Sequence, residues 1–103
     1  MKKIKATKEN LFKALQLRFP KYDVKLYDEE EYDVQIGIFD TTTPTLCDVR
    51  GIVSAFFKEW HNIVNCNSSF GFVEIYVSDG VMRKNVNVDT LSMYVSENVL
   101  ESL

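Results

Sequence analysis

A chain of 103 residues, 46% of them hydrophobic and 13% aromatic, has enough apolar side chains for one core and predicts a single domain over residues 1–103. No stretch approaches the roughly 20 apolar residues of a membrane helix, and no apolar secretory core follows the lysine-rich start. We therefore expect a cytoplasmic protein without membrane contact, whose two cysteines, Cys47 and Cys66, are reduced thiols.

The net charge of -3 hides an uneven distribution of charge along the chain. Residues 1–25 carry eight lysines and arginines against two carboxylates, whereas the remainder carries four against 13. Such a protein can present a basic end to an anion and repel it elsewhere.

The first elements are a predicted helix and a predicted strand pair. Thr7 can cap a helix whose apolar residues recur at helical spacing, and Pro20 ends it after Phe19. Apolar and polar residues then alternate over residues 22–26 and 32–38, which indicates two strands with one buried face each.

A second helix is predicted after the polar break at residues 40–44. Thr45 and Asp48 resemble a capping box, and a broad apolar stripe extends from Val49 to Trp60. We expect Gly51, inside this helix, to mark a close approach to a strand.

The last third of the chain predicts a second hairpin and a third helix. A loop over residues 62–69 precedes a strand over 70–77, a turn at Ser78-Asp79-Gly80 and a strand over 81–88. Residues 89–103 then fit a helix capped at Asp89 or Thr90, with a strand near Leu91 to Val95 as the alternative. The order α-β-β-α-β-β-α predicts an α+β two-layer sandwich, with an antiparallel sheet of about four strands and helices mainly on one face.

From about Lys8 to Phe57, the order of these signals resembles the large polyvalent protein-associated domains, most closely the member numbered twenty-nine. These are modules of phages and conjugative elements. The resemblance rests on Leu11 and Leu15 before Phe19-Pro20, the alternating strands at Val24, Ile36 and Ile38, Pro44-Thr45, and the apolar residues of the second helix. It implies a mobile genetic element as the source and carries no catalytic residue.

The residues offer no recognisable catalytic or metal-binding pattern, so we expect no enzyme activity and no cofactor. His61 is the only histidine, and Cys47 lies too far along the predicted helix, about 21 Å, to form a dyad with it. The spacing of Cys47, His61 and Cys66 is not that of a zinc site, and the acidic run after Tyr27 lacks the glycine and alternation of a calcium loop. A glycine-rich phosphate loop is also missing.

The acidic connection between the first two strands is the strongest functional signal. Consecutive carboxylates repel one another, so retaining them in a connection indicates a contact surface, and tyrosines flank them. We expect a non-enzymatic module that binds a protein partner, such as a host nucleic-acid-binding or defence protein that it inhibits. The candidate protein-binding residues are Tyr27, Asp28, Glu29, Glu30, Glu31, Tyr32 and Asp33.

Two alternatives remain open at this stage. One is nucleic-acid binding, with phosphates contacting Lys2, Lys3, Lys5, Lys8 and Lys13 and bases stacking on sheet aromatics such as Tyr27, Phe39, Phe72 and Tyr76. The other is a purely structural role. The sequence leaves the oligomeric state undetermined.

Overall fold

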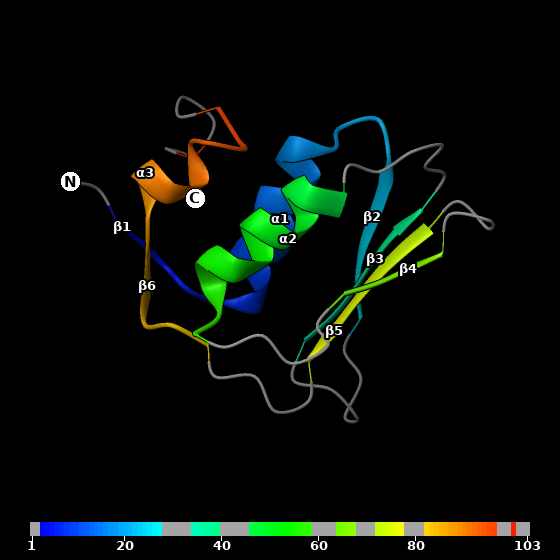
Figure 1. Cartoon of the computed structure of the whole chain (residues 1–103), viewed down its shortest axis with the longest axis horizontal. Coiled ribbons are helices and arrows are strands. Elements are labelled where there is room, and N and C mark those ends of the chain that lie inside the picture. Colours follow the sequence, from blue (N-terminus) through cyan, green and yellow to red (C-terminus); the bar gives the residue numbers. More distant parts are fainter. Residues whose placement is uncertain are drawn as a thin grey trace.

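The computed structural model describes residues 3–27, 34–39, 46–58, 64–67, 72–77, 82–96 and 100. It confirms an α+β protein in which the helices lie on one face of a four-stranded antiparallel sheet (Figure 1). The elements are β1 (Lys3–Lys5), α1 (Lys8–Arg18), β2 (Asp23–Tyr27), β3 (Val34–Phe39), α2 (Leu46–Phe56), β4 (Val64–Asn67), β5 (Phe72–Val77), β6 (Asn85–Asn87) and α3 (Val88–Leu91).

The predicted cap of the first helix is present. Thr7 has an extended backbone, and its side-chain oxygen accepts a hydrogen bond of 3.1 Å from the Asn10 amide. This bond satisfies one of the free N–H groups at the start of α1. Leu11, Ala14 and Leu15 form the buried face, and the Phe19 amide closes the last turn on the Leu15 carbonyl.

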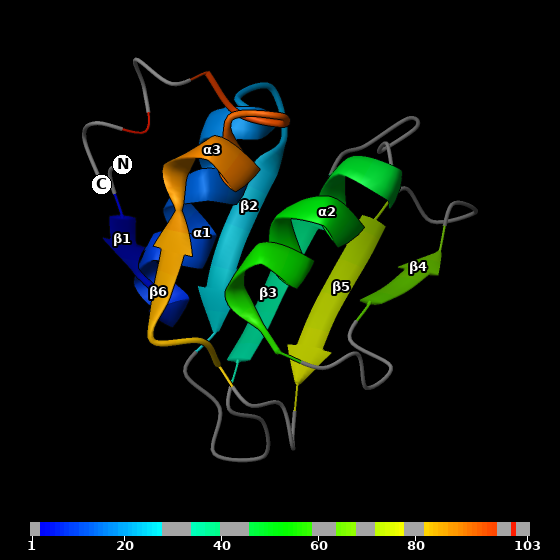
Figure 2. The same cartoon turned by 60° about the vertical axis from the view of Figure 1, so that its left-hand side comes forward.

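The large sheet has the strand order β2-β3-β5-β4, with every pair antiparallel. Val24 pairs with Ile38, and Ile36 pairs with both Leu26 and Ile75, so apolar residues line one face of the sheet. This face packs against α1 and α2, whose buried residues complete the core (Figure 2). The alternation predicted for the first strand pair therefore places its apolar side chains correctly.

The predicted second hairpin is wrong. The strand over 70–77 exists as β5, but its outer neighbour is β4, which lies in the segment predicted as a loop. The segment predicted as its partner, 81–88, instead contains β6, which pairs with the unpredicted strand β1. The strands β1, β4 and β6 alternate polar and apolar residues, but each has only three or four residues. So short a pattern is a weak signal, and neighbouring strands rather than local propensity decide these pairings.

The predicted final helix is also wrong in length. Its helical part is α3, which begins after Asn87 instead of at Asp89 or Thr90, and the chain turns over residues 92–95. The Ser92 hydroxyl donates to the Asp89 carbonyl, a local bond that competes with helical structure. Leu91 and Val95 are nevertheless buried, as the apolar spacing predicts.

Gly51 marks a close approach, but to an aromatic ring and not to the predicted strand. An ideal Cβ at this position would overlap the outer atoms of the Tyr94 ring. The turn after α3 therefore packs directly against α2 because residue 51 has no side chain.

Replacing Gly51 with Ala should lower stability in the natural chain and raise it once Tyr94 is replaced with Ala. Overpacking costs about 1–3 kcal/mol, whereas Ala in a helix interior gains about 1 kcal/mol over Gly. Urea unfolding of the natural chain, G51A, Y94A and the double variant measures both effects. A stabilising G51A in the natural chain would contradict the packing of Tyr94 on α2.

Candidate functional site

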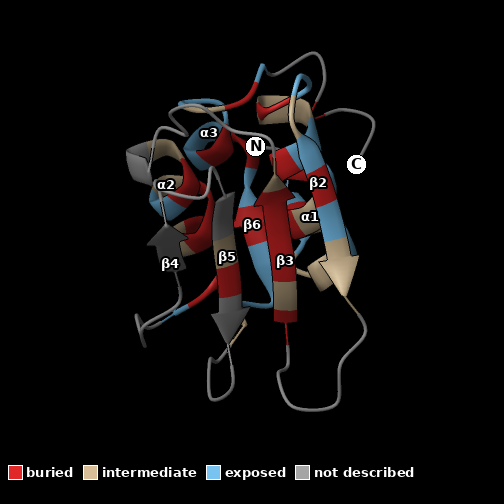
Figure 3. Ribbon diagram, turned by 90° about the vertical axis from the view of Figure 1, so that its right-hand side faces the viewer, coloured by how far each residue is buried: buried red, intermediate tan, exposed pale blue. Residues whose placement is uncertain are grey.

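Among the described residues, no helix covers one face of the four-stranded sheet, which we call the uncovered face. Figure 3 looks onto this face, with α1 and α2 behind the strands. Because side chains alternate between the two faces of a strand, the positions between the core residues point outward here. Those that the structure describes are Asp23, Lys25, Tyr27, Gln35, Gly37, Phe39 and Glu74.

Two aromatic rings lie over Gly37 at the centre of this face. An ideal Cβ on Gly37 would be 2.6 Å from Phe39 Cε2 and 3.3 Å from Tyr27 Cε2. Gly37 is consequently buried although it lies on the uncovered face, whereas both rings remain half-exposed. We call Tyr27, Gly37 and Phe39 the aromatic platform.

A lysine borders the aromatic platform. Lys25 pairs with Gly37 in the strand register, and its Nζ lies 5.6 Å from the centre of the Phe39 ring, within the range of a cation–π contact. The same Nζ is 3.5 Å from Asp23 Oδ2. The platform is thus flanked by a cation whose charge is partly balanced by a neighbouring carboxylate.

The predicted protein-binding residues are only partly placed by the structure. Tyr27 is the last residue of β2 and belongs to the aromatic platform. The acidic residues after it, Asp28 to Asp33, lie outside the described residues. Sequence analysis did not identify Gly37, although a glycine within an alternating strand is a known sign of close packing.

The predicted nucleic-acid-binding residues lie elsewhere. Lys3 and Lys5 are exposed on β1, Lys13 is exposed on α1, and Lys8 is half-buried in the first turn of α1. Figure 1 shows β1 and β6 on the other side of the two helices from the four-stranded sheet. The lysines of β1 and the aromatic platform therefore do not form one surface. The nucleic-acid hypothesis had placed both groups on a single binding surface. Lys2 falls outside the described residues.

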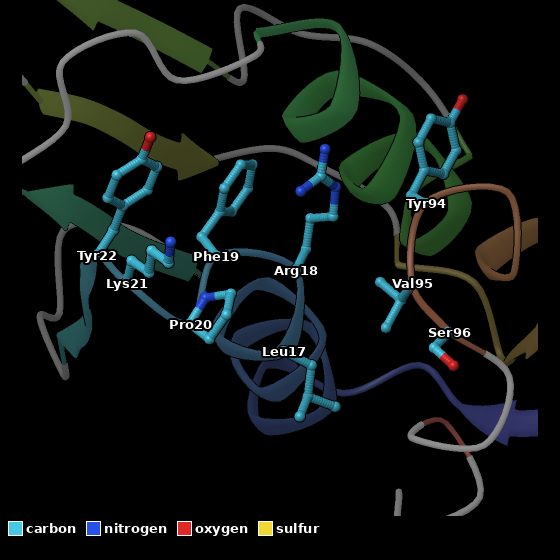
Figure 4. A pocket seen from close by; sticks show the side chains of 9 residues that line it. All are labelled: Leu17, Arg18, Phe19, Pro20, Lys21, Tyr22, Tyr94, Val95 and Ser96. Carbon is cyan, nitrogen blue, oxygen red and sulfur yellow. The ribbon is translucent and has the colours of Figure 1, made fainter.

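A cavity of about 470 Å³ lies at the C-terminal end of α1 (Figure 4). Its apolar wall consists of Leu17, Phe19, Pro20 and Val95, and the rings of Tyr22 and Tyr94 stand at opposite sides. Arg18, Lys21 and Ser96 add polar groups. Sequence analysis missed this site because its two lining segments, 17–22 and 94–96, are far apart in the chain.

Arg18 is held in position by contacts on two sides. Its guanidinium donates a hydrogen bond to the carboxylate of Asp48 in the first turn of α2, and its Cζ lies 5.1 Å from the centre of the Phe19 ring. Asp48, predicted to complete a capping box, thus joins the end of α1 to the start of α2. Thr45, the other residue of that box, is not among the described residues.

Tyr94 also borders a second cavity of about 420 Å³ between α2 and β6. Arg83, Asn85, Asn87 and Thr90 give this cavity a polar wall. Among its described lining residues, Tyr94 alone is aromatic, unlike in the first cavity.

Within the described ranges, no three histidine, cysteine or carboxylate side chains come close enough to hold a metal ion. His61 is outside those ranges, so its relation to Cys47 is untested. Among the described segments, no helix is both long and apolar enough to cross a membrane.

Comparison with protein-family models, curated proteins and solved structures finds no match to this chain. The resemblance to the large polyvalent protein-associated domains therefore stays a prediction.

The Arg18–Asp48 pair should contribute a small, salt-sensitive coupling to stability. Both side chains are partly exposed, which limits such a pair to about 0.5–1 kcal/mol. We expect this coupling in a double-mutant cycle of Arg18→Gln and Asp48→Asn measured by urea unfolding, and a smaller value at 1 M than at 0.05 M salt, where screening is weaker. A coupling of zero at low salt would show that the pair does not link the helices energetically.

Proposed function

We propose that this protein is a non-enzymatic module that binds a protein partner through the uncovered sheet face and the acidic connection after it. The observation that carries the proposal is the aromatic platform, in which Tyr27 and Phe39 lie over Gly37 on the face that no helix covers. Aromatic side chains are enriched at protein interfaces because they bury a large area and have few rotatable bonds.

The acidic connection follows this platform directly in the sequence, because Asp28 is the residue after Tyr27. Aromatic side chains followed in the chain by a run of carboxylates suit a basic partner surface that carries an exposed apolar or cationic side chain. Lys25, which borders the platform, is paired with Asp23 at the start of β2, and this pairing partly balances its charge.

The partner that fits this surface is a nucleic-acid-binding protein of a host cell. Its basic surface is built for phosphates, and a cluster of carboxylates can occupy the same surface. The resemblance to domains of phages and conjugative elements supports a host defence protein as the target and inhibition as the outcome.

Replacing residues 28–31 with Ser, or Tyr27 alone with Ser, should weaken binding of such a partner while the fold remains intact. Removing four carboxylates should lower affinity most at low salt, and removing the Tyr27 ring should lower it at all salt concentrations. Partners captured from nuclease-treated bacterial lysate would be purified and titrated against each variant by biolayer interferometry.

Met93→Ser is the matched control, because Met93 is 76% exposed but lies in the turn after α3, away from the sheet face. A captured protein whose affinity is unchanged in both test variants would contradict the proposed surface. Displacement of the partner by double-stranded DNA would identify its nucleic-acid site as the contact.

A second candidate function is phosphate contact by the small β1–β6 sheet. Lys3 and Lys5 are exposed on β1, and Lys84 is exposed where its carbonyl accepts a hydrogen bond from the Ala6 amide. None of these three lysines forms an ion pair within the described part of the chain. Three exposed lysines on one small sheet support binding to a nucleic-acid backbone without base recognition.

Replacing Lys3, Lys5 and Lys84 with Gln should flatten the salt dependence of nucleic-acid binding. On duplex DNA, the slope of log affinity against log salt should fall by roughly 0.9 for each phosphate that the variant no longer neutralises. Fluorescence anisotropy with a labelled 20-base-pair duplex measures this slope. Lys25→Gln, on the sheet face, is the control, and a slope unchanged in the triple variant would contradict this second function.

A further inference from the structure

The cavity at the end of α1 combines flat apolar walls with positive charge. We propose that it binds a small organic anion with a planar apolar body and one oxyanion group, such as a phosphate or carboxylate. This site lies next to Tyr22, before the start of β2, whereas the aromatic platform begins at Tyr27, where β2 ends. The proposal is therefore independent of the proposed protein-binding function.

The size and walls of the cavity fit a planar body. Its volume of about 470 Å³ lies within the range of small-molecule sites, which is roughly 300–1,000 Å³. Phe19 and Tyr22 are stacked, with ring centres 5.7 Å apart and ring planes 22° from parallel. Tyr94 stands on the opposite side of the cavity, and Arg18 lies between it and Phe19 (Figure 4). A planar body entering beside Arg18 therefore meets the guanidinium plane on one side and the Tyr94 ring on the other.

The described wall of the cavity carries two cations and no carboxylate. Arg18 and Lys21 line it, and Asp48, which pairs with Arg18, is not part of the wall. Tyr22, Tyr94 and Ser96, which also line the cavity, carry hydroxyl groups, of which that of Tyr94 rests against Gly51 of α2. These groups can bind an oxyanion. Asp48 balances the charge of Arg18, whereas Lys21 keeps its positive charge.

Arg18 is prepared to bind an anion before the anion arrives. A guanidinium has five N–H donors, and the bond to Asp48 leaves others for a ligand. Because Asp48 and the Phe19 ring already fix the side chain, binding requires little further ordering of it.

One feature of the site opposes anion binding. The C-terminal end of a helix such as α1 carries a partial negative charge of roughly half an elementary charge. Asp48 balances Arg18, and the remaining formal positive charge of Lys21 exceeds this partial charge. In addition, the Phe19 carbonyl beside the cavity already accepts a hydrogen bond of 3.2 Å from the Tyr22 amide, so it is not directed freely at a ligand.

The first test titrates the full chain with 1-naphthyl phosphate, and with 1-naphthol and inorganic phosphate as partial probes. We expect saturable binding of 1-naphthyl phosphate, with amide shifts in nitrogen–proton spectra centred on residues 17–22 and 94–96. Each partial probe should bind at least about tenfold more weakly, because it lacks the oxyanion contacts or the ring contacts. Equal affinity for 1-naphthol, or shifts centred elsewhere, would overturn the proposal.

Variants separate ligand binding from the structural role of Arg18. Arg18→Gln combined with Asp48→Asn should weaken 1-naphthyl phosphate binding about tenfold or more, whereas Asp48→Asn alone should preserve or strengthen it. Lys21→Gln should also weaken binding and, at an exposed turn residue, should leave the fold intact. Lys25→Gln, outside the cavity, removes the same charge and should have no effect.

The pattern of these variants decides the outcome. If Asp48→Asn weakens binding as much as the double variant, Arg18 acts only as a partner of Asp48, and the proposal is wrong. Equal losses in Lys21→Gln and Lys25→Gln would show that the overall charge, and not the cavity, attracts the probe, and would also overturn it.

Discussion

The burial of one sheet face determines most of this structure. Leu11 and Leu15 of α1 and Ile52 and Phe56 of α2 are fully buried, and both helices lie on the side where Ile36 and Ile38 form the centre of the sheet. Neither α1 nor α2 reaches the other side. The uncovered face must therefore protect its own backbone, and it does so where Tyr27 and Phe39 lie over Gly37. The same packing that shields a glycine leaves both rings half-exposed on this face.

The sites argued from this structure are separated by the helices and by the length of β2. The aromatic platform lies on the outer sheet face, the exposed lysines of β1 lie beyond the helices, and the cavity lies where α1 ends. The sequence had suggested one nucleic-acid-binding surface made of the N-terminal lysines and the sheet aromatics. In the structure, the helices separate the lysines of β1 from the sheet aromatics (Figure 1).

The parts of the fold predicted from sequence are those with a long, regular pattern. The alternation of β2 and β3 and the apolar stripe of α2 repeat over several residues. The cap at Thr7 depends on residues within one turn of it. Interactions between near neighbours in the sequence therefore identify all three features. The strands β1, β4 and β6 have three or four residues each, and only their neighbours make them strands. The cavity could not be predicted, because Arg18 meets Asp48 across 30 residues of sequence and Tyr94 comes from yet another segment.

The position of Tyr94 links the cavity to the packing of α2. Its ring occupies the space that a side chain at residue 51 would fill, and the same residue lines the cavity beside Arg18. Arg18 in turn is bonded to Asp48 at the start of α2. A ligand between Arg18 and Tyr94 thus contacts two groups that both rest on α2, one near its first turn and one at Gly51. Because a ligand stabilises whatever conformation binds it, occupation of the cavity favours the packing of the turn after α3 against α2.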